Sequence, residues 1–398
     1  MRISTAFRFD ESVDSLQRRQ REMSDVQTAM TNGKRINTPS DDPTGAARAE
    51  RAFITQKRIE SEQRLVNASR NALSLGESTL GSAMGLLQDA RETMVLSGNA
   101  SFTASERSAQ VLHLKSLRSQ LMSLANMDDG AGGFVFGGQS GHAQPFVDTP
   151  GGVVSNASPG QQQLSQREAM PTTLDGGAVW LSAATGNGVF VNEANAANTG
   201  QAWITPGTVT DPGALTGSSY SLVFTVLPGG TTFSMLENGA PTALSNQPYL
   251  PSSAISIDGM SFNIAGQPAD GDRFEITPSS NSLDPFAALD RAIAVLNDPL
   301  ANGGQVAQAV NNGLRDLDSV LRQFQSARSS TGANLNRLDS VDNRNQDRSL
   351  WAEKVKSETE DVDMVKAISA FQNKQTSYQA ALQSYAMVQR MSLFDYIK

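Results

Sequence analysis

The chain has 398 residues, a formal net charge of -8 and no cysteine. This length is enough for two or three domains with a sizeable core, and the lack of cysteine excludes disulfides and thiol chemistry. No run of about 18 apolar residues occurs, and the first residues lack the apolar core of a secretory signal peptide. We therefore expect a soluble chain that, if exported, does not use such a signal.

The net charge comes from the middle of the chain. Residues 139–283 contain ten acidic and two basic residues, so the two outer segments together are neutral although dense in charge. Neutral, charge-dense helices suit packing against copies of themselves, whereas an acidic middle suits a solvated surface. No basic patch stands out, so nothing indicates nucleic-acid binding.

Apolar residues recur every seven positions in the first thirty residues, which predicts a narrow apolar stripe along one helix. Gly33 then suits the left-handed cap that ends a helix. Gln20 and Gln27 occupy stripe positions, and polar residues there fix register while lowering stability. The predicted contacts of this first arm are Phe9, Val13, Leu16, Met23 and Met30.

A second helix is predicted from Asp42-Pro43, an aspartate cap before a proline in the first helical position, to about Ser97. Its apolar residues again recur at intervals of seven, which predicts a long rod with left-handed supercoiling. Small residues at Ser69, Gly76, Ala83 and Ala90 predict the close approach of another helix. The predicted rod seam consists of Ile59, Val66, Leu73, Leu80, Leu87 and Met94.

A third helix is predicted after Thr103, because Glu106 follows at the spacing of a capping box. We expect Asp128-Asp129-Gly130 to end it and residues 134–136 to form a short strand or one leg of a hairpin. Residues 139–283 then contain 12 of the 16 prolines and 18 of the 33 glycines, with short β-rich runs between them. Residues 254–257 and 260–264 flank Asp258-Gly259, which is a strong hairpin signal, and residues 220–227 and 231–236 predict a second hairpin.

Helical patterns return at Asp284-Pro285, followed by an apolar face and a break at Pro299 and Gly303-Gly304. A further seam, interrupted near Arg328, Thr331 and Gly332, is expected to pair with the rod seam. Its residues are Leu314, Leu321 and Leu335, with Leu317, Phe324 and Leu338 as the alternate frame.

The last forty residues repeat the pattern of the first thirty, with glutamines at Gln375 and Gln389. We expect the two chain ends to pair, because each stripe needs a partner and both are weakened by glutamine. An ordinary intramolecular bundle would not require matching stripes at the two extreme ends. The predicted contacts of the second arm are Met364, Ile368, Phe371, Tyr378, Leu382 and Tyr385.

The predicted fold is therefore mainly α with an inserted β domain. Residues 1–42 with 355–398 form terminal coiled-coil arms, residues 43–140 with 284–354 form a helical rod, and residues 141–283 form a β-rich surface domain. Whether this surface domain is one unit or two stays open.

Candidate catalytic and metal-binding groups are sparse. His113 and His142 are isolated, and residues 138–142 lack the last glycine of a nucleophile elbow. The acids at 128–129 and 270–272 do not have the spacing of a calcium loop, and no phosphate-binding Gly-Lys-Ser/Thr loop occurs. We expect no enzyme activity, no metal and no cofactor.

Residues 31–47 closely resemble the N-terminal signature of the bacterial flagellin superfamily. The signature residues are Gly33, Lys34, Arg35, Asn37, Ser40, Asp41, Asp42 and Pro43. Residues 1–5, 124–126, 134–138, 145–146, 271–276, 335–340 and 392–398 are similar to the hook-associated members of this superfamily, whereas filament flagellins usually end differently.

The resemblance implies a structural adaptor that joins hook to filament, with arms that are disordered in the monomer and fold into an inner coiled-coil layer. It also implies a secreted protein at the hook–filament junction of the flagellum, exported by the flagellar type III apparatus. The implied partners are copies of itself, the first hook-associated protein, flagellin, and an export chaperone on the C-terminal arm. Alternatives are a filament flagellin and, from another class, an adhesin or glycan-binding module in the β domain.

Overall fold

The computed structural model describes residues 3–99, 102–130, 132–138, 143–158, 160, 162–165, 168–170 and 173–394. The helices are α1 (Ile3–Asn32), α2 (Pro43–Ser97), α3 (Ala104–Ala125), α4 (Gly176–Trp180), α5 (Pro285–Leu296), α6 (Gly303–Glu360), α7 (Met364–Phe394) and the 3-10 helix η1 (Pro212–Ala214). The strands are β1 (Phe146–Thr149), β2 (Gly152–Ser155), β3 (Gln162–Ser165), β4 (Glu168–Met170), β5 (Phe190–Ala194), β6 (Trp203–Ile204), β7 (Thr208–Val209), β8 (Tyr220–Leu227), β9 (Gly230–Glu237), β10 (Ala240–Pro241), β11 (Gln247–Pro248), β12 (Ala254–Ile257), β13 (Met260–Ala265) and β14 (Arg273–Pro278).

Two compact units divide the chain. One comprises Met1–Arg64 with Ser340–Lys398, and the other comprises Leu65–Asp339. The second unit contains the β domain and most of the helical core, and the first contains both chain ends. The predicted class, helical outer segments around a central β region, is confirmed.

The predicted seam of α2 is buried along its whole length. Ile59 is 3% exposed, and every later seam residue from Val66 to Met94 is fully buried. In the unit Leu65–Asp339, α2 and α6 run antiparallel, as shown by ion pairs from Arg91 to Asp318 (2.8 Å) and from Arg70 to Asp339 (2.9 Å). The predicted pairing of these two seams is therefore confirmed.

The buried frame of α6 is the alternate one. Leu317, Phe324 and Leu338 are fully buried, whereas Leu314, Leu321 and Leu335 are only partly buried. The predicted interruption is wrong, because α6 is continuous and the seven-residue spacing passes through Thr331 and Asn345, which are 1% and 2% exposed. The Thr331 hydroxyl donates to the carbonyl oxygen of Ala327 (2.8 Å), which satisfies it inside the seam.

An aromatic cluster around Trp180 closes the core of the helical part of this unit. The Trp180 ring lies 4.8 Å from Phe324, 5.5 Å from Phe136 and 5.9 Å from Phe286, measured between centroids. Phe136 is fully buried here, which explains the apolar run at residues 134–136. Of the two predicted alternatives, the strand is wrong and a hairpin-like contact is present: an isolated antiparallel bridge joins Phe134 to Asp128, and residues 135–136 lie in a turn.

Two other local predictions need correction. The third helix begins at the Thr103–Glu106 capping box as predicted, but it ends at Ala125, and residues 128–130 form the turn beyond it. At Gly76 the close neighbours are Leu174 and Val135, which lie in loops, so the missing side chain makes room for a loop and not for a helix.

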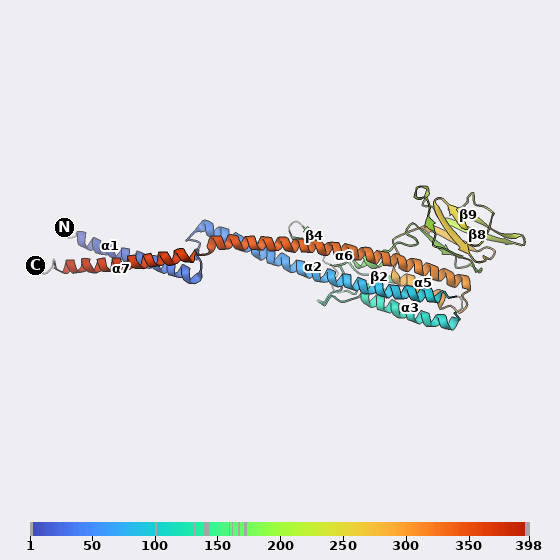
Figure 1. Cartoon of the computed structure of the whole chain (residues 1–398), viewed down its shortest axis with the longest axis horizontal. Helices are drawn as coiled ribbons and strands as arrows, with labels where there is room; N and C mark the ends of the chain where they lie inside the picture. Colours follow the sequence, from blue (N-terminus) through green and yellow to red (C-terminus); the bar gives the residue numbers. More distant parts are fainter. Residues whose placement is uncertain are drawn as a thin grey trace. The chain divides into compact units, whose positions relative to one another are not determined.

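Within the β domain, β1 pairs with β2 and β3 pairs with β4 as separate two-stranded sheets. Residues 190–278 form two larger antiparallel sheets in the same unit (Figure 1). In one sheet the order is β10-β9-β8-β14-β5, with β11 also beside β9, and in the other it is β12-β13-β6, with β7 also beside β13. Both predicted hairpins are confirmed, as β8 with β9 and β12 with β13. Asp258 and Gly259 both have positive φ in the tight turn of the second hairpin. The inward-facing side chains of the two sheets share one core, which includes Phe190, Ile204, Tyr220 and Phe274.

Some predicted features lie outside the described residues. They are residues 1–2, His142 with residues 139–141, residues 395–398, and the side chains of Phe9 and Gln389.

Candidate assembly interface

Helices α1 and α7 lie side by side in the unit that contains both chain ends (Figure 1). An ion pair joins Lys374 of α7 to Glu22 of α1, and it lowers the pKa of Glu22, first by its hydrogen bond and then by its charge. The predicted pairing of the chain ends is confirmed. We call α1 with α7 the terminal pair.

The terminal pair buries its predicted contacts only in part. Val13, Leu16, Met23 and Met30 of α1 and Phe371, Tyr378 and Tyr385 of α7 are partly buried. On α7, Met364 and Ile368 are each 45% exposed and Leu382 is 42% exposed. Two helices can bury only one strip of each other, so the pair keeps apolar surface in contact with solvent.

The glutamines expected to weaken these stripes are exposed. Gln20 and Gln27 lie on α1 and Gln375 on α7, all on the solvated side of the pair. Sequence reasoning missed three further exposed apolar residues, Phe7, Val365 and Met387. They stand outside the seven-residue frame, so the frame gave no signal for them.

Residues 33–43 pack against residues 357–363, and we call this contact the joint. Gly33 has a φ of +70° and ends α1 as predicted. The Arg35 backbone N–H donates to the Glu360 carbonyl (2.7 Å), and the Val362 backbone N–H donates to the Gly33 carbonyl (3.0 Å). Lys34 also pairs with the Glu360 carboxylate. The joint thus ties two segments more than 300 residues apart into a short antiparallel bridge.

Two aspartates of the signature hold the loop in shape. Asp41 accepts the backbone N–H groups of Thr38 (2.8 Å) and Asn37 (3.0 Å), and these bonds lower the pKa of its carboxyl. Asp42 accepts the backbone N–H of Gly45 (2.9 Å), the bond with the largest effect in lowering its pKa. This is the predicted cap of α2, which begins at Pro43.

The remaining signature residues also have partners in the joint. Arg35 donates to the Thr359 carbonyl (2.8 Å) and to the Asp42 carboxylate (3.2 Å). The Asn37 side-chain amide donates to the Lys34 carbonyl (3.4 Å), and the hydroxyls of Thr38 and Ser40 are 2.7 Å apart. A Cβ at Gly45, in the first turn of α2, would come within 3 Å of the side chains of Asp42 and Ile36, which would have to move.

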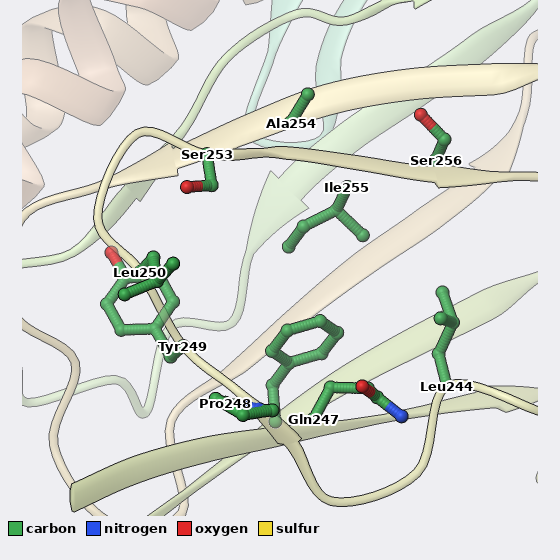
Figure 2. A pocket seen from close by; sticks show the side chains of 10 residues that line it. Leu244, Gln247, Pro248, Tyr249, Leu250, Ser253, Ala254, Ile255 and Ser256 are labelled. Carbon is green, nitrogen blue, oxygen red and sulfur yellow. The ribbon is translucent and has the colours of Figure 1, made fainter.

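The β domain has a separate hollow of about 200 Å³ beside β11 and β12, with Leu244, Pro248 and Leu250 on one side and residues 253–256 on the other (Figure 2). No charged side chain lines it. The Tyr249 hydroxyl donates within the domain, to carbonyls of Ile264 (3.1 Å) and Gly266 (2.9 Å), and its ring packs edge-on against Phe224. The tyrosine is therefore part of the domain core and does not form an open stacking platform.

Metal-ligating residues do not gather in the described part of the chain: no group of three or more histidines, aspartates or glutamates lies together there. His113 is an exposed residue of α3. Of the helices among the described residues, none combines the length and apolarity that crossing a bilayer needs. The interface described above works through packing, hydrogen bonds and ion pairs.

Comparison with known proteins gives matches over both ends of the chain and over its full length. Residues 3–140 match the bacterial flagellin N-terminal helical region, and residues 314–397 match the bacterial flagellin C-terminal helical region. Flagellar hook-associated protein 3 of Escherichia coli is 24% identical over 404 residues, which span 100% of both chains.

Solved structures agree with these matches. FlgL of Xanthomonas campestris is 30% identical, with a TM-score of 0.65, over 71% of this chain and 93% of that one. Flagellar hook-associated protein 3 of Legionella pneumophila is 26% identical, with a TM-score of 0.70, over 77% of this chain and 97% of that one. The resemblance found in residues 31–47 is confirmed. This chain belongs to the flagellar hook-associated protein 3 (FlgL) family of the flagellin superfamily, and it is a structural component of the bacterial flagellum.

Proposed function

We propose that this chain is the adaptor that joins hook to filament, and that it assembles with copies of itself through the terminal pair. The observation that carries the proposal is the apolar surface left open on that pair, where Ile368 and Leu382 are 45% and 42% exposed. Burial of apolar surface contributes roughly 25 cal/mol per Å². Assembly would therefore complete a core that two helices alone cannot close.

The proposed contacts are those predicted from the seven-residue spacing. Because α1 and α7 leave residues such as Ile368 and Leu382 uncovered, we propose that the arms are disordered in the monomer and fold on assembly. The contacts are Phe9, Val13, Leu16, Met23, Met30, Met364, Ile368, Phe371, Tyr378, Leu382 and Tyr385.

Copies are proposed to associate head to tail. A head-to-tail contact uses two different surfaces of the same chain, so it propagates a ring or a helix and does not close a two-fold dimer. The division into arms (1–42 with 355–398), rod (43–140 with 284–354) and surface domain (141–283) stays part of the proposal. The rod would supply lateral contacts, and residues 33–43 would form the spoke that joins the layers.

The other proposed partners are those that the resemblance to hook-associated proteins implies. The FlgL structure from Legionella pneumophila is described as a flagellar junction protein. We propose for this chain the first hook-associated protein on the hook side, flagellin on the filament side, and an export chaperone on the C-terminal arm before assembly. Secretion by the flagellar type III apparatus, an extracellular position and the lack of enzyme activity belong to the same proposal.

The test is immunogold labelling of intact flagella with an antibody against residues 139–283. We expect gold in one narrow band between hook and filament, and no gold on flagella from cells that lack this protein. Label along the whole filament would identify a filament flagellin instead, and the junction role would be wrong. Label absent from flagella that carry normal hooks and filaments would exclude both roles.

A further inference from the structure

A hollow of about 350 Å³ lies beside the joint, on one flank of the helices α2 and α6. Its walls include Ile36 and Ala49, which are each 7% exposed, and the ring of Phe53, which is 37% exposed. Glu50 and Lys356 stand at the same hollow. All of these residues belong to the unit that contains both chain ends.

The hollow combines apolar walls with ammonium groups. At the hollow, the Lys356 Nζ lies 5.1 Å from the centroid of the Phe53 ring. The Lys57 Nζ lies 5.6 Å from the same ring but outside the hollow, and it pairs with Glu60 (3.0 Å). Ammonium groups attract the negative face of an aromatic ring, and tryptophan is the strongest partner. A flat, electron-rich aromatic side chain is therefore the group that this hollow fits.

The same unit presents such a side chain. Trp351 of α6 is 65% exposed, whereas Trp180 is fully buried in the aromatic cluster. An indole left in solvent keeps a large apolar area uncovered, and tryptophan is enriched among the residues that dominate binding energy in interfaces. Its sequence neighbour Leu350 is equally exposed, at 65%.

Helix geometry puts Trp351 and the hollow on opposite flanks. Successive residues are rotated by about 100° around an α-helix. Phe53 comes one residue after buried Ala52 on α2, and Lys356 comes one residue after buried Val355 on α6. These two side chains contact each other, so on both helices the residue that follows a buried seam residue lies on the same flank. Trp351 lies one step before buried Ala352 and so lies on the other flank. A chain cannot place its own Trp351 in its own hollow.

We propose that Trp351 of one copy inserts into the hollow beside Phe53 of the next copy. This inference rests on the proposed function, because it names one lateral contact of the self-assembly. A projection on one flank and a matching hollow on the opposite flank form a head-to-tail contact that propagates. Along α6, Trp351 precedes the hollow residues Lys356 and Glu360, so neighbouring copies are displaced along the helix axis by roughly 8 to 14 Å.

Photo-crosslinking in assembled flagella tests the contact. The photoreactive amino acid p-benzoylphenylalanine replaces Trp351 in the full chain, made in cells without their own copy, and the flagella are purified and irradiated. We expect dimers and larger adducts whose cross-linked peptide contains Phe53. The matched control places the same group at Leu350, which points away from both flanks, and should give at least about tenfold less of that peptide.

The reverse experiment guards against a variant that fails to assemble. The photoreactive group replaces Glu50, which leaves Trp351 intact, and the cross-linked peptide should contain Trp351. Protein present in the flagella without these two peptides would overturn the contact and leave the junction role standing. Absence of the unmodified chain from purified flagella would instead overturn the proposed function.

Substitutions give an independent readout. Trp351→Ala should lower the amount of this protein in purified flagella about tenfold, the size expected for losing a buried aromatic anchor. Trp351→Phe should restore most of it, and Leu350→Ala should have no effect. The unfolding midpoint of the free chain should be the same for both alanine variants, because both side chains are exposed in it. Normal incorporation of Trp351→Ala would also overturn the contact.

Discussion

The seam of α2 and the terminal pair carry the same seven-residue spacing but end in different states. Leu73, Leu80 and Leu87 are fully buried in the seam, whereas Ile368 and Leu382 of the terminal pair are 45% and 42% exposed. Spacing therefore predicts which face of a helix is apolar. It does not predict whether the chain itself supplies everything that covers this face.

The difference arises from what stands beside each helix pair. Around the seam, loop residues Val135 and Leu174 fill the space at Gly76, and the aromatic cluster of Trp180 closes the core. In the terminal pair, α1 and α7 pack on each other and still leave Ile368 45% exposed and Leu382 42% exposed. A third surface is needed there, and under the proposed function other copies supply it.

The largest expected effect comes from breaking the terminal pair alone. Leu16→Asp with Leu382→Asp should abolish incorporation into flagella, because each carboxylate would be buried without a partner on assembly. The unfolding of the free chain should change little, since both side chains are at least partly exposed in it. Immunoblots of purified flagella and chemical unfolding of the monomer measure the two effects.

The matched control adds the same charge on the outward face. Gln17→Asp with Gln383→Asp alters two exposed residues of the same helices and should incorporate normally. Normal incorporation of the Leu16 and Leu382 variant would mean that these residues are not assembly contacts. Equal loss in both variants would point to charge, and not to burial, as the cause.

A substitution in the α2 seam should instead lower the stability of the free chain. Leu80 is fully buried, so Leu80→Ala should lower the free energy of unfolding by about 2–5 kcal/mol. Leu382→Ala, at 42% exposure, should cost under about 1 kcal/mol. Guanidinium unfolding followed by circular dichroism measures both, and similar costs would remove the distinction between the two regions.

Sequence reading succeeded where one signal dominated. The Asp42-Pro43 and Asp284-Pro285 caps, the Thr103–Glu106 capping box and the Asp258-Gly259 turn all have local causes, and each lies where it was predicted. The α2 seam was also predictable, because every seventh residue from Ile59 to Met94 is apolar.

The failures have physical reasons as well. In α6 the polar residues Thr331 and Asn345 occupy buried seam positions, so hydrophobicity alone indicated an interruption that the helix does not have. Phe136 is apolar because it enters the Trp180 cluster, not because it lies in a strand. The joint pairs Lys34 with Glu360, and no local pattern indicates a contact between segments so distant in sequence.

A smaller effect is expected at the cap of α5, in the unit with the complete core. The Asp284 carboxylate accepts the backbone N–H of Ala287 (2.7 Å), so Asp284→Ala should cost about 1 kcal/mol of unfolding free energy. Burial raises the pKa of Asp284, because it disfavours the charged form. Asp284→Asn keeps an oxygen acceptor without the charge, so it should change the free energy of unfolding very little. A large loss in this variant would show that the charge itself is needed.

The smallest expected effect is the response of the joint to acid. Backbone N–H bonds from Thr38 and then Asn37 hold the pKa of Asp41 below its ordinary 3.8, and the bond from Gly45 does the same for Asp42. A carboxyl whose pKa is lowered by folding stabilises the folded state fully above its unfolded pKa. This contribution is lost as the pH falls below 3.8 through the lower folded value.

Leu73, Leu80 and Leu87 are held by apolar burial, which does not titrate, so the joint should loosen in acid before this part of the α2 seam. Hydrogen exchange of residues 33–43, corrected for the intrinsic rate at each pH, should accelerate between pH 5 and pH 2.5, about the range over which such carboxyls titrate. Exchange at Leu73, Leu80 and Leu87 serves as the internal reference. Asp41→Asn keeps one oxygen acceptor but cannot titrate, so it should flatten the pH dependence. A joint equally protected at both pH values would mean that these carboxylates shape the loop without stabilising it.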